Sequence, residues 1–379
     1  MIMGNKKSYE RYQRQLILKC FGEKAQDALE ASRVLIIGAG GLGCPILQYL
    51  VAAGVGHIGI ADHDKVSLSN LHRQILFGTD DIGQFKVDVV KRKMQQLNPE
   101  VEIHVWREEW SHRHCVDHFP SYDLIVDATD NFASRYMIND AAVLMNKTVV
   151  FGAVSQYEGQ VAVFHHLQKD GKRSVHYRDL FPEPPAYGEV LNCSEAGVLG
   201  VLPGIVGSVQ AAEVIKLITG LGEPLSNKLW NYHALSQEVF ILQLSQHPLA
   251  HAKMPKTMEE FLATDYEWFC QVPQASIKEI NILEWNQNHS KDWLVDIREP
   301  YEQPRLNTWA QASGVDLLEI PLSALENNLP SLSGKNIVFI CQAGKRSLQA
   351  ASMMMQQNQA SAVFSLKGGV NELIAKNLI

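Results

Sequence analysis

Residues 33–43, Arg33-Val-Leu-Ile-Ile-Gly-Ala-Gly-Gly-Leu-Gly43, decide how the rest of this chain is interpreted. The run Val34–Ile37 is short and wholly apolar, as in buried parallel strands. Glycines follow at once, at Gly38, Gly40, Gly41 and Gly43. Glycines between a strand and a helix let the backbone approach a phosphate, which the free amides of the helix attract. The stretch predicts a nucleotide-binding site, and its pattern is compatible with both NAD and ATP.

Short apolar runs alternate with helical patterns as far as residue 166. We expect strands at 33–37, 57–61, 102–106, 122–127, 147–152 and 159–165, and helices at 44–53, 85–97 and 133–145. This alternation is typical of a doubly wound, mostly parallel α/β sheet of the Rossmann type. A buried helix from Pro203 to Thr219 and strands at 228–234 and 237–244 complete the first domain, 1–245. Asp62 ends the second strand, about 20 residues after the glycines, where such folds bind a ribose hydroxyl.

Polar residues after the second and fourth strands favour a triphosphate. Asn70, Arg73 and Lys86 offer amide and cationic donors that match phosphate oxygens. Asp130 follows the strand at 122–127, and a carboxylate beside phosphates suits Mg²⁺. Each residue alone is equally compatible with an ordinary surface loop, and Asp130 or Asn131 with a helix N-cap. Together, downstream of the glycines, they predict phosphate binding.

Length, composition and charge limit the number of domains and the classes of protein to which the chain can belong. A chain of 379 residues with 46% hydrophobic content has room for two domains. The formal charge of −7 argues against nucleic-acid binding. No apolar run reaches the roughly 18 residues of a membrane span, and the N-terminus lacks an apolar signal core, so we expect a cytoplasmic protein. Six cysteines without a pairing pattern predict free thiols.

A second small α/β domain is expected at 274–379, after a linker at 246–273 that has no sustained pattern. Its strands are predicted at 292–297, 336–340 and 362–366. The middle strand runs directly into the loop Cys341-Gln-Ala-Gly-Lys-Arg346-Ser347, which a helix follows. Converging amides and a helix N-terminus stabilise the anionic forms of a thiol. The alternative, a buried cysteine that closes a strand, is weaker because glycine and cationic residues follow it.

Two further segments of the chain contain candidate functional residues. Residues 8–29 predict an amphipathic helical arm on which Arg11 and Arg14 form a solvated face. Cys193 lies in an irregular segment ahead of the helix at Pro203. Its position is compatible with a nucleophile, although its chemistry alone favours an inert thiol.

Residues 8–244 resemble the ubiquitin-activating-enzyme-like adenylyltransferases of the MoeB and ThiF group. The matching stretches, in order, are Arg11-Tyr-Gln-Arg14-Gln15, Gly38-Ala-Gly-Gly-Leu-Gly43, Ser69-Asn-Leu-His-Arg73-Gln74, Lys86, Ala128-Thr-Asp130-Asn131-Phe132, Cys193-Ser-Glu-Ala-Gly197 and Pro203-Gly-Ile-Val-Gly207-Ser208. So many motifs in order make the match specific, whereas the glycine loop alone would be weak.

The resemblance implies adenylation of the C-terminal glycine of a ubiquitin-like sulfur-carrier protein that ends in Gly-Gly. It also implies that Mg-ATP is bound by Gly38, Gly40, Gly41, Gly43, Asp62, Ser69, Asn70, Leu71, Arg73, Lys86, Asp130 and Asn131, with Asp130 as the metal ligand. In such a family the protein is a homodimer, and Arg14 reaches the phosphates of the partner subunit.

Residues 274–379 resemble a rhodanese domain through Asp296-Ile-Arg-Glu, the Cys341 loop and Leu366-Lys-Gly-Gly369. Arg346 follows Cys341 by five positions, as in single rhodanese modules, and the related phosphatase loops are one residue longer. The segment 296–320 departs from the usual rhodanese pattern. The resemblance implies that Cys341 carries a persulfide beside Arg346, loaded by a cysteine desulfurase or by thiosulfate. Cys193 would hold an acyl or disulfide intermediate, and the product would be a thiocarboxylate.

Many relatives hold a structural zinc with two Cys-x-x-Cys pairs. Here the corresponding stretches contain His176, Asp179, His247 and His251. Because structural zinc sites are rich in cysteine, we expect that zinc has been lost.

Other functions remain open at this point. The carrier could serve molybdopterin or thiazole synthesis, or the thionucleoside, siderophore or sulfur amino acid pathways. An NAD-dependent oxidoreductase is supported only by the glycine fingerprint and Asp62. A non-catalytic scaffold that binds a ubiquitin-like partner has no need of Arg73, Lys86, Asp130 and Cys341 together.

Overall fold

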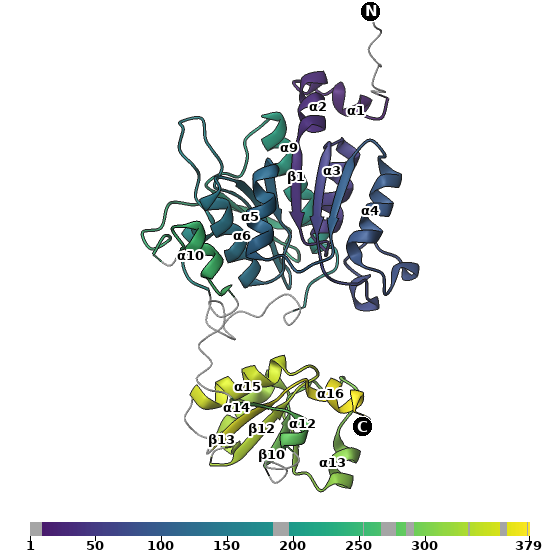
Figure 1. The fold of residues 1–379 in the computed structure, drawn as a ribbon, viewed down its shortest axis with the longest axis vertical. Coiled ribbons are helices and arrows are strands. Elements are labelled where there is room, and N and C mark those ends of the chain that lie inside the picture. Colours follow the sequence, from purple (N-terminus) through teal and green to yellow (C-terminus); the bar gives the residue numbers. More distant parts are fainter. Residues whose placement is uncertain are drawn as a thin grey trace, which may run out of the picture. The chain divides into compact units, whose positions relative to one another are not determined.

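A computed structural model describes residues 10–184, 197–252, 254–266, 278–285, 292–332, 334–356, 362–376 and 378–379. Cys193 lies outside the described residues. The chain forms two compact units, each with its own sheet (Figure 1). We describe the two units separately.

The first unit is built on an eight-stranded sheet of order β3-β2-β1-β4-β5-β6-β7-β8. The strands are β1 Arg33–Ile37, β2 His57–Ala61, β3 Glu102–Trp106, β4 Leu124–Asp127, β5 Thr148–Ser155, β6 Glu158–Phe164, β7 Lys228–His233 and β8 Glu238–Gln243. The strands β3, β2, β1, β4 and β5 are parallel, and the remainder pair antiparallel. The doubly wound, mostly parallel sheet predicted from the sequence is therefore confirmed.

Helices cover both faces of this sheet (Figure 1). They are α1 Gln13–Leu16, α2 Gly22–Ala31, α3 Gly43–Ala53, α4 Lys86–Leu97, α5 His112–His118, α6 Phe132–Leu144, α7 Tyr177–Leu180, α9 Leu202–Thr219 and α10 Met258–Ala263, with short 3₁₀ turns at Leu68–Asn70, Thr79–Asp81 and Phe119–Ser121. One apolar core lies under α3, α4 and α9, and the other lies under α5 and α6. Since β2 and β4 flank β1, the sheet reverses its winding at β1 and leaves a crevice at the carboxyl ends of these strands.

The helix α9 is long and apolar enough, by length and composition, to cross a membrane, contrary to the expectation that the chain has no apolar run of that length. Its composition has another explanation here, because Leu202, Val206 and Val214 are buried in the core. The helix also contains a buried polar residue, Gln210, that forms hydrogen bonds with the sheet. Gln210 donates from Nε2 to the Asp127 and Val150 carbonyl oxygens at 2.9 and 3.3 Å. These bonds connect α9 to the end of β4 and to β5.

The structure differs from two sequence expectations. The arm at 8–29 is not one helix, because Cys20 and Gly22 have φ angles of 70° and 60° and separate α1 from α2. The stretch expected to be a linker contains α10, and Phe261 and Tyr266 are buried in the core beside α5 and α6. Long-range packing of two aromatic residues therefore makes residues 258–266 part of the first unit.

The second unit has a five-stranded parallel sheet of order β11-β10-β12-β13-β9. Its strands are β9 Lys278–Ile280, β10 Trp293–Asp296, β11 Leu317–Glu319, β12 Asn336–Ile340 and β13 Ala362–Leu366. Its helices are α12 Ile282–Glu284, α13 Asn307–Ser313, α14 Leu322–Asn328, α15 Lys345–Gln356 and α16 Gly369–Ala375, with a 3₁₀ turn at Leu329–Leu332. Apolar clusters pack on both faces of this sheet, as the small α/β prediction requires.

Candidate functional site

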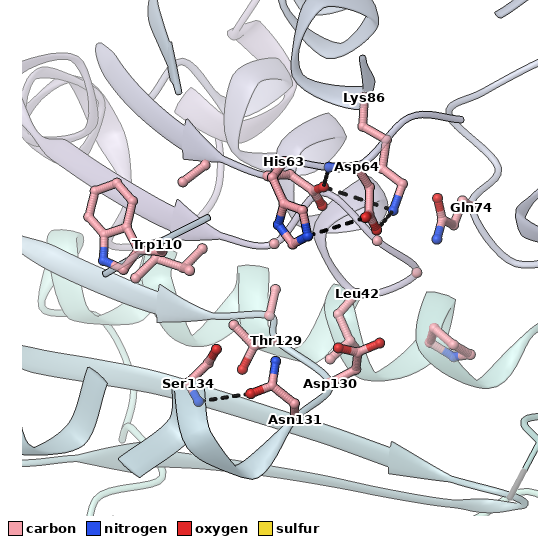
Figure 2. Close-up of a pocket in the computed structure, with 18 of the residues that line it drawn as sticks. Leu42, His63, Asp64, Gln74, Lys86, Trp110, Thr129, Asp130, Asn131 and Ser134 are labelled. Atoms are coloured by element: carbon pink, nitrogen blue, oxygen red, sulfur yellow. Dashed lines mark hydrogen bonds and ion pairs between the residues drawn. The ribbon is translucent and has the colours of Figure 1, made fainter. Parts of the chain in front are cut away.

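A pocket opens at the carboxyl ends of β1, β2 and β4, where the sheet reverses its winding. Predicted site residues that line it are Gly38, Gly40, Gly41, Asp62, Asn70, Arg73, Lys86, Asp130 and Asn131. Figure 2 shows Lys86 and Asp64 on one side of the pocket and Thr129, Asp130 and Asn131 on the other. Residues from five separate segments of the chain thus meet in one place.

The glycine loop is shaped by close packing. Gly38 follows β1 with a φ of 105°, and its N–H donates to the Ala61 carbonyl oxygen at 2.9 Å. A Cβ atom on Gly38 would lie 2.5 Å from the Ala128 carbonyl oxygen. Gly43 does not line the pocket, and a Cβ atom there would overlap the Gly38 carbonyl oxygen. Gly43 therefore lets α3 begin directly against the loop.

Asp62 fixes this loop to the end of β2. Its two carboxylate oxygens accept the N–H groups of Ala39 and Asp64, each at 2.8 Å. The Lys86 ammonium lies 3.9 Å from Asp62 and 2.7 Å from Asp64. Burial raises the pKa of Asp62 above its ordinary value, and the nearby Lys86 charge opposes that shift. Lys86 is only 4% exposed, so a buried cation faces the space between the glycines and the two aspartates.

The opposite side of the pocket is the turn between β4 and α6. Asp127 is buried and accepts the N–H and hydroxyl of Thr129 at 3.0 and 2.7 Å. Burial raises the pKa of Asp127. Asn131 caps α6 by accepting the Ser134 N–H at 2.8 Å. Asp130 is exposed, and its carboxylate has no hydrogen bond or ion pair within the described ranges. The N-cap role therefore belongs to Asn131, which leaves Asp130 available to a cation.

Other predicted residues lie beside the pocket or away from it. Arg73 lines it and donates from Nη1 to the Ser69 carbonyl oxygen at 3.0 Å. Ser69 thus holds the arginine through its backbone, while Leu71 packs against the core. Arg14 is exposed on α1 and does not line this pocket.

Sequence reasoning missed several residues that line the pocket. They include His63, Asp64, Gln74, Trp110, Thr129 and Arg135. Asp64 could have been found from its position two residues after Asp62. Trp110 gives no local signal, and only the place of β3 beside β2 brings its segment to this edge. The Gln74 Oε1 atom is buried without a partner among the described residues, so the pocket contains an acceptor that a polar ligand can satisfy.

The second unit places Cys341 at the end of β12, directly before α15. The thiol is 1% exposed, and its sulfur accepts the Gly344 N–H at 3.1 Å. The Ser347 hydroxyl lies 3.6 Å from the same sulfur. Arg346 binds Glu302 with two hydrogen bonds of 2.7 and 2.5 Å. Of the predicted loop amides, that of Gly344 binds the sulfur in the described part of the chain, and the arginine of the loop is held by a carboxylate.

His176, Asp179, His247 and His251, where the resemblance implies that relatives hold zinc, form a compact polar cluster. Asp179 accepts the His176 and His247 backbone N–H groups at 2.8 Å each. The His176 and His251 ring centroids are 4.9 Å apart, and burial lowers the pKa of His176. Within the described part of the chain, no three or more His, Cys, Asp or Glu side chains are arranged to hold a metal ion. Both Asp179 oxygens bind backbone amides, so this set fits a structural zinc poorly.

The fold and the two sites define a nucleotide-binding α/β enzyme joined to a sulfur-transfer domain. Residues 12–252 match the ThiF family, and residues 281–376 match the rhodanese-like domain. The chain belongs to the ThiF family and is an adenylyltransferase with a C-terminal rhodanese-like domain. Membership of an adenylyltransferase family implies that the nucleotide is ATP and argues against the NAD alternative.

Three named relatives agree with this assignment. The sulfur carrier protein adenylyltransferase of Thermus thermophilus is 46% identical over 265 residues, covering 70% of this chain and 97% of that protein. The probable adenylyltransferase/sulfurtransferase MoeZ of Mycobacterium tuberculosis is 39% identical over 370 residues, covering 95% and 91%. The adenylyltransferase and sulfurtransferase MOCS3-1 of Zea mays is 37% identical over 374 residues, covering 93% and 78%.

Solved structures show the fold of the first unit. The crystal structure of MccB from Escherichia coli has a TM-score of 0.55 and 22% sequence identity, and covers 67% of this chain and 75% of that chain. At this identity the likeness extends to the fold alone.

Replacing Lys86 with alanine tests the pocket. We expect ATP–pyrophosphate exchange to fall at least about 100-fold, because a buried cation that faces the developing phosphate charge is lost. The control is Lys91→Ala on the same helix, which should exchange at the wild-type rate. Circular dichroism melting checks that both variants fold. A folded Lys86→Ala protein with exchange close to wild type would show that the phosphates bind elsewhere.

Proposed function

We propose that this chain activates the C-terminal glycine of a ubiquitin-like sulfur-carrier protein with ATP and converts it to a thiocarboxylate. The observation that carries the proposal is the coexistence, in one chain, of the Lys86 pocket and the Cys341 loop. The first suits activation of a carboxylate as an acyl-adenylate, and the second suits delivery of sulfur to it. The name of the Thermus relative supports a sulfur carrier as the substrate.

In the adenylation step, a carboxylate oxygen of the carrier attacks the α-phosphate and pyrophosphate leaves. The glycine-loop amides, Asn70, Arg73 and Lys86 would bind phosphate oxygens and stabilise the charge that develops on them. Asp130 would hold Mg²⁺, which when bound neutralises phosphate charge. The exposed, unpaired carboxylate of Asp130 fits that ligand. The chain's own contribution is chiefly positioning and electrostatic stabilisation.

In the sulfur step, the terminal sulfur of a Cys341 persulfide attacks the activated carbonyl carbon and AMP leaves. The Gly344 amide would support the anionic sulfur. The resulting acyl disulfide is opened by a thiol, which forms a disulfide with Cys341 and releases the thiocarboxylate. Cys193 is our candidate for that thiol or for an acyl intermediate, by resemblance alone.

The protein would act as a homodimer, with Arg14 serving the pocket of the partner subunit. Support comes from α1, where Arg14 is exposed and the following Ile17 and Leu18 are 69% and 58% exposed. Apolar side chains that are uncovered in one chain are typical of surfaces that a second copy covers.

The chain would need no structural zinc, because Asp179 already joins residues 176–179 to residue 247 through hydrogen bonds. Metal analysis of the purified protein should find well under one zinc per chain, and chelators should leave its melting temperature unchanged. One tightly bound zinc per chain would contradict this proposal.

Replacing Cys341 with alanine separates the two steps. We expect ATP–pyrophosphate exchange with the carrier to persist, because the adenylation residues lie in the other unit, and thiocarboxylate formation to disappear. Intact mass spectrometry of each endogenous carrier that ends in Gly-Gly measures the product and also identifies the carrier. The control is Cys20→Ser, an exposed thiol in the first unit that should keep both activities. Loss of both activities in Cys341→Ala would contradict two separable sites, and failure of every carrier to promote exchange would contradict the function.

Subunit mixing tests the role of Arg14. Arg14→Ala and Lys86→Ala should each be inactive in exchange. After the two are refolded together, heterodimers should contain one intact pocket and restore about a quarter of wild-type activity, as statistical pairing in a twofold dimer predicts. If the mixture stays inactive while the wild type refolds, Arg14 does not act across subunits.

A further inference from the structure

The cysteine loop of the second unit has two arginines in contact with it, and both are paired with carboxylates. Arg298 is fully buried, binds Asp296 at 2.7 Å and donates to Gln342 of the loop at 3.1 Å. Arg346, in the loop itself, binds Glu302. The positive charges of both arginines beside the thiol are therefore balanced by carboxylates of the protein.

Glu302 is held in place from two directions. It lies in the connection between β10 and α13, 44 residues before Arg346 in the chain. Its Oε2 atom accepts Arg346 Nη1 at 2.7 Å and the Glu299 backbone N–H at 2.8 Å, and its Oε1 atom accepts Arg346 Nη2 at 2.5 Å. Its side chain is 19% exposed and that of Arg346 is 25% exposed, so the pair is largely shielded from water. Paired hydrogen bonds of this kind are stronger than single ones.

The pair stays charged near neutral pH. The hydrogen bonds from Arg346 hold the pKa of Glu302 below its ordinary value. The same bonds hold the pKa of Arg346 above its ordinary value. Protonation of Glu302 would therefore release the arginine only in acid.

This pairing bears on which molecules can deliver sulfur. Thiosulfate is a small dianion, and an arginine that is free to bind its sulfonate would lower the free energy of its complex. Here Glu302 occupies both terminal nitrogens of Arg346, and its own charge repels an approaching anion. A persulfide on a protein cysteine bears one negative charge, on the sulfur that is transferred, and has no sulfonate to place.

We propose that Glu302 selects the sulfur donor by occupying Arg346, so that Cys341 takes sulfur from a protein-borne cysteine persulfide and discriminates against thiosulfate. The inference rests on the proposed function of Cys341 and narrows its donor. In the step itself, the Cys341 thiolate attacks the terminal sulfur of the donor, and the S–S bond of the donor breaks. The donor leaves as a cysteine thiolate, or as sulfite in the case of thiosulfate. Cys341 becomes a persulfide, and its thiol proton goes to solvent.

The test compares Glu302→Gln with wild type in the full-length protein. One donor is thiosulfate, assayed with cyanide by thiocyanate formation. The other is a cysteine desulfurase with L-cysteine, assayed by the intact mass of persulfidated Cys341. Glu319→Gln is the matched control, because Glu319 binds Arg305 of the same unit at 3.0 and 2.5 Å and is 32% exposed.

We expect Glu302→Gln to raise kcat/KM for thiosulfate at least about tenfold, mainly through KM, because the guanidinium becomes free for the sulfonate. Loading from the desulfurase should change less than about threefold, since no arginine bond is used. Glu319→Gln should match wild type with both donors. The double variant Glu302→Gln/Arg346→Met should lose the gain with thiosulfate, which a purely structural role of Glu302 would not predict.

An unchanged or lower kcat/KM for thiosulfate in Glu302→Gln, with normal loading from the desulfurase, would overturn the inference and leave the proposed function intact. Persistence of the gain in the double variant would also overturn it. If neither donor loads Cys341 in any folded variant, the proposed function fails and the inference fails with it.

Discussion

The buried carboxylate of Asp62 is the constraint on which the first unit's site depends. It binds the Ala39 amide of the glycine loop and the Asp64 amide that follows β2, so one side chain sets the position of two loops. Burying this charge costs free energy, as its raised pKa indicates, and Lys86 supplies the compensating charge. In the proposed reaction, the same lysine also binds the phosphates. The site is therefore charged and ordered before any nucleotide arrives, which lowers the cost of organising it during the reaction.

The second unit also places cationic side chains beside carboxylates, but the pairs differ in how many hydrogen bonds join them. In the first unit, Lys86 faces an open pocket and is paired with Asp64, which is itself 55% exposed, through a single close contact of 2.7 Å. In the second, Arg346 and Arg298 are each bound to a carboxylate of the protein. The first site thus presents a cation to an open pocket, while the second presents the Gly344 amide to the sulfur of Cys341. This difference is what a chain that activates a carboxylate at one site and carries sulfur at the other requires.

Local sequence patterns were sufficient to predict the strands and the glycine loop, because these features depend on neighbouring residues in the chain. Apolar runs of strand length gave β1 to β6 near their observed positions, and glycines placed the loop after β1. The parts that sequence missed depend on distant contacts. Phe261 and Tyr266 belong to the first core because of packing against α5 and α6. Trp110 reaches the pocket only because β3 lies beside β2, and the Glu302–Arg346 pair spans 44 residues. No periodic pattern encodes such contacts.

The central claim is that ATP binds at the carboxyl ends of β1, β2 and β4 and is held there by Lys86. A crystal structure with a non-hydrolysable ATP analogue and Mg²⁺ tests it most directly. We predict phosphates over Gly38–Gly41, the Lys86 ammonium bound to phosphate oxygen instead of Asp64, and Asp130 as a ligand of the metal. A nucleotide bound elsewhere, or an intact Lys86–Asp64 pair beside bound phosphates, would contradict the account.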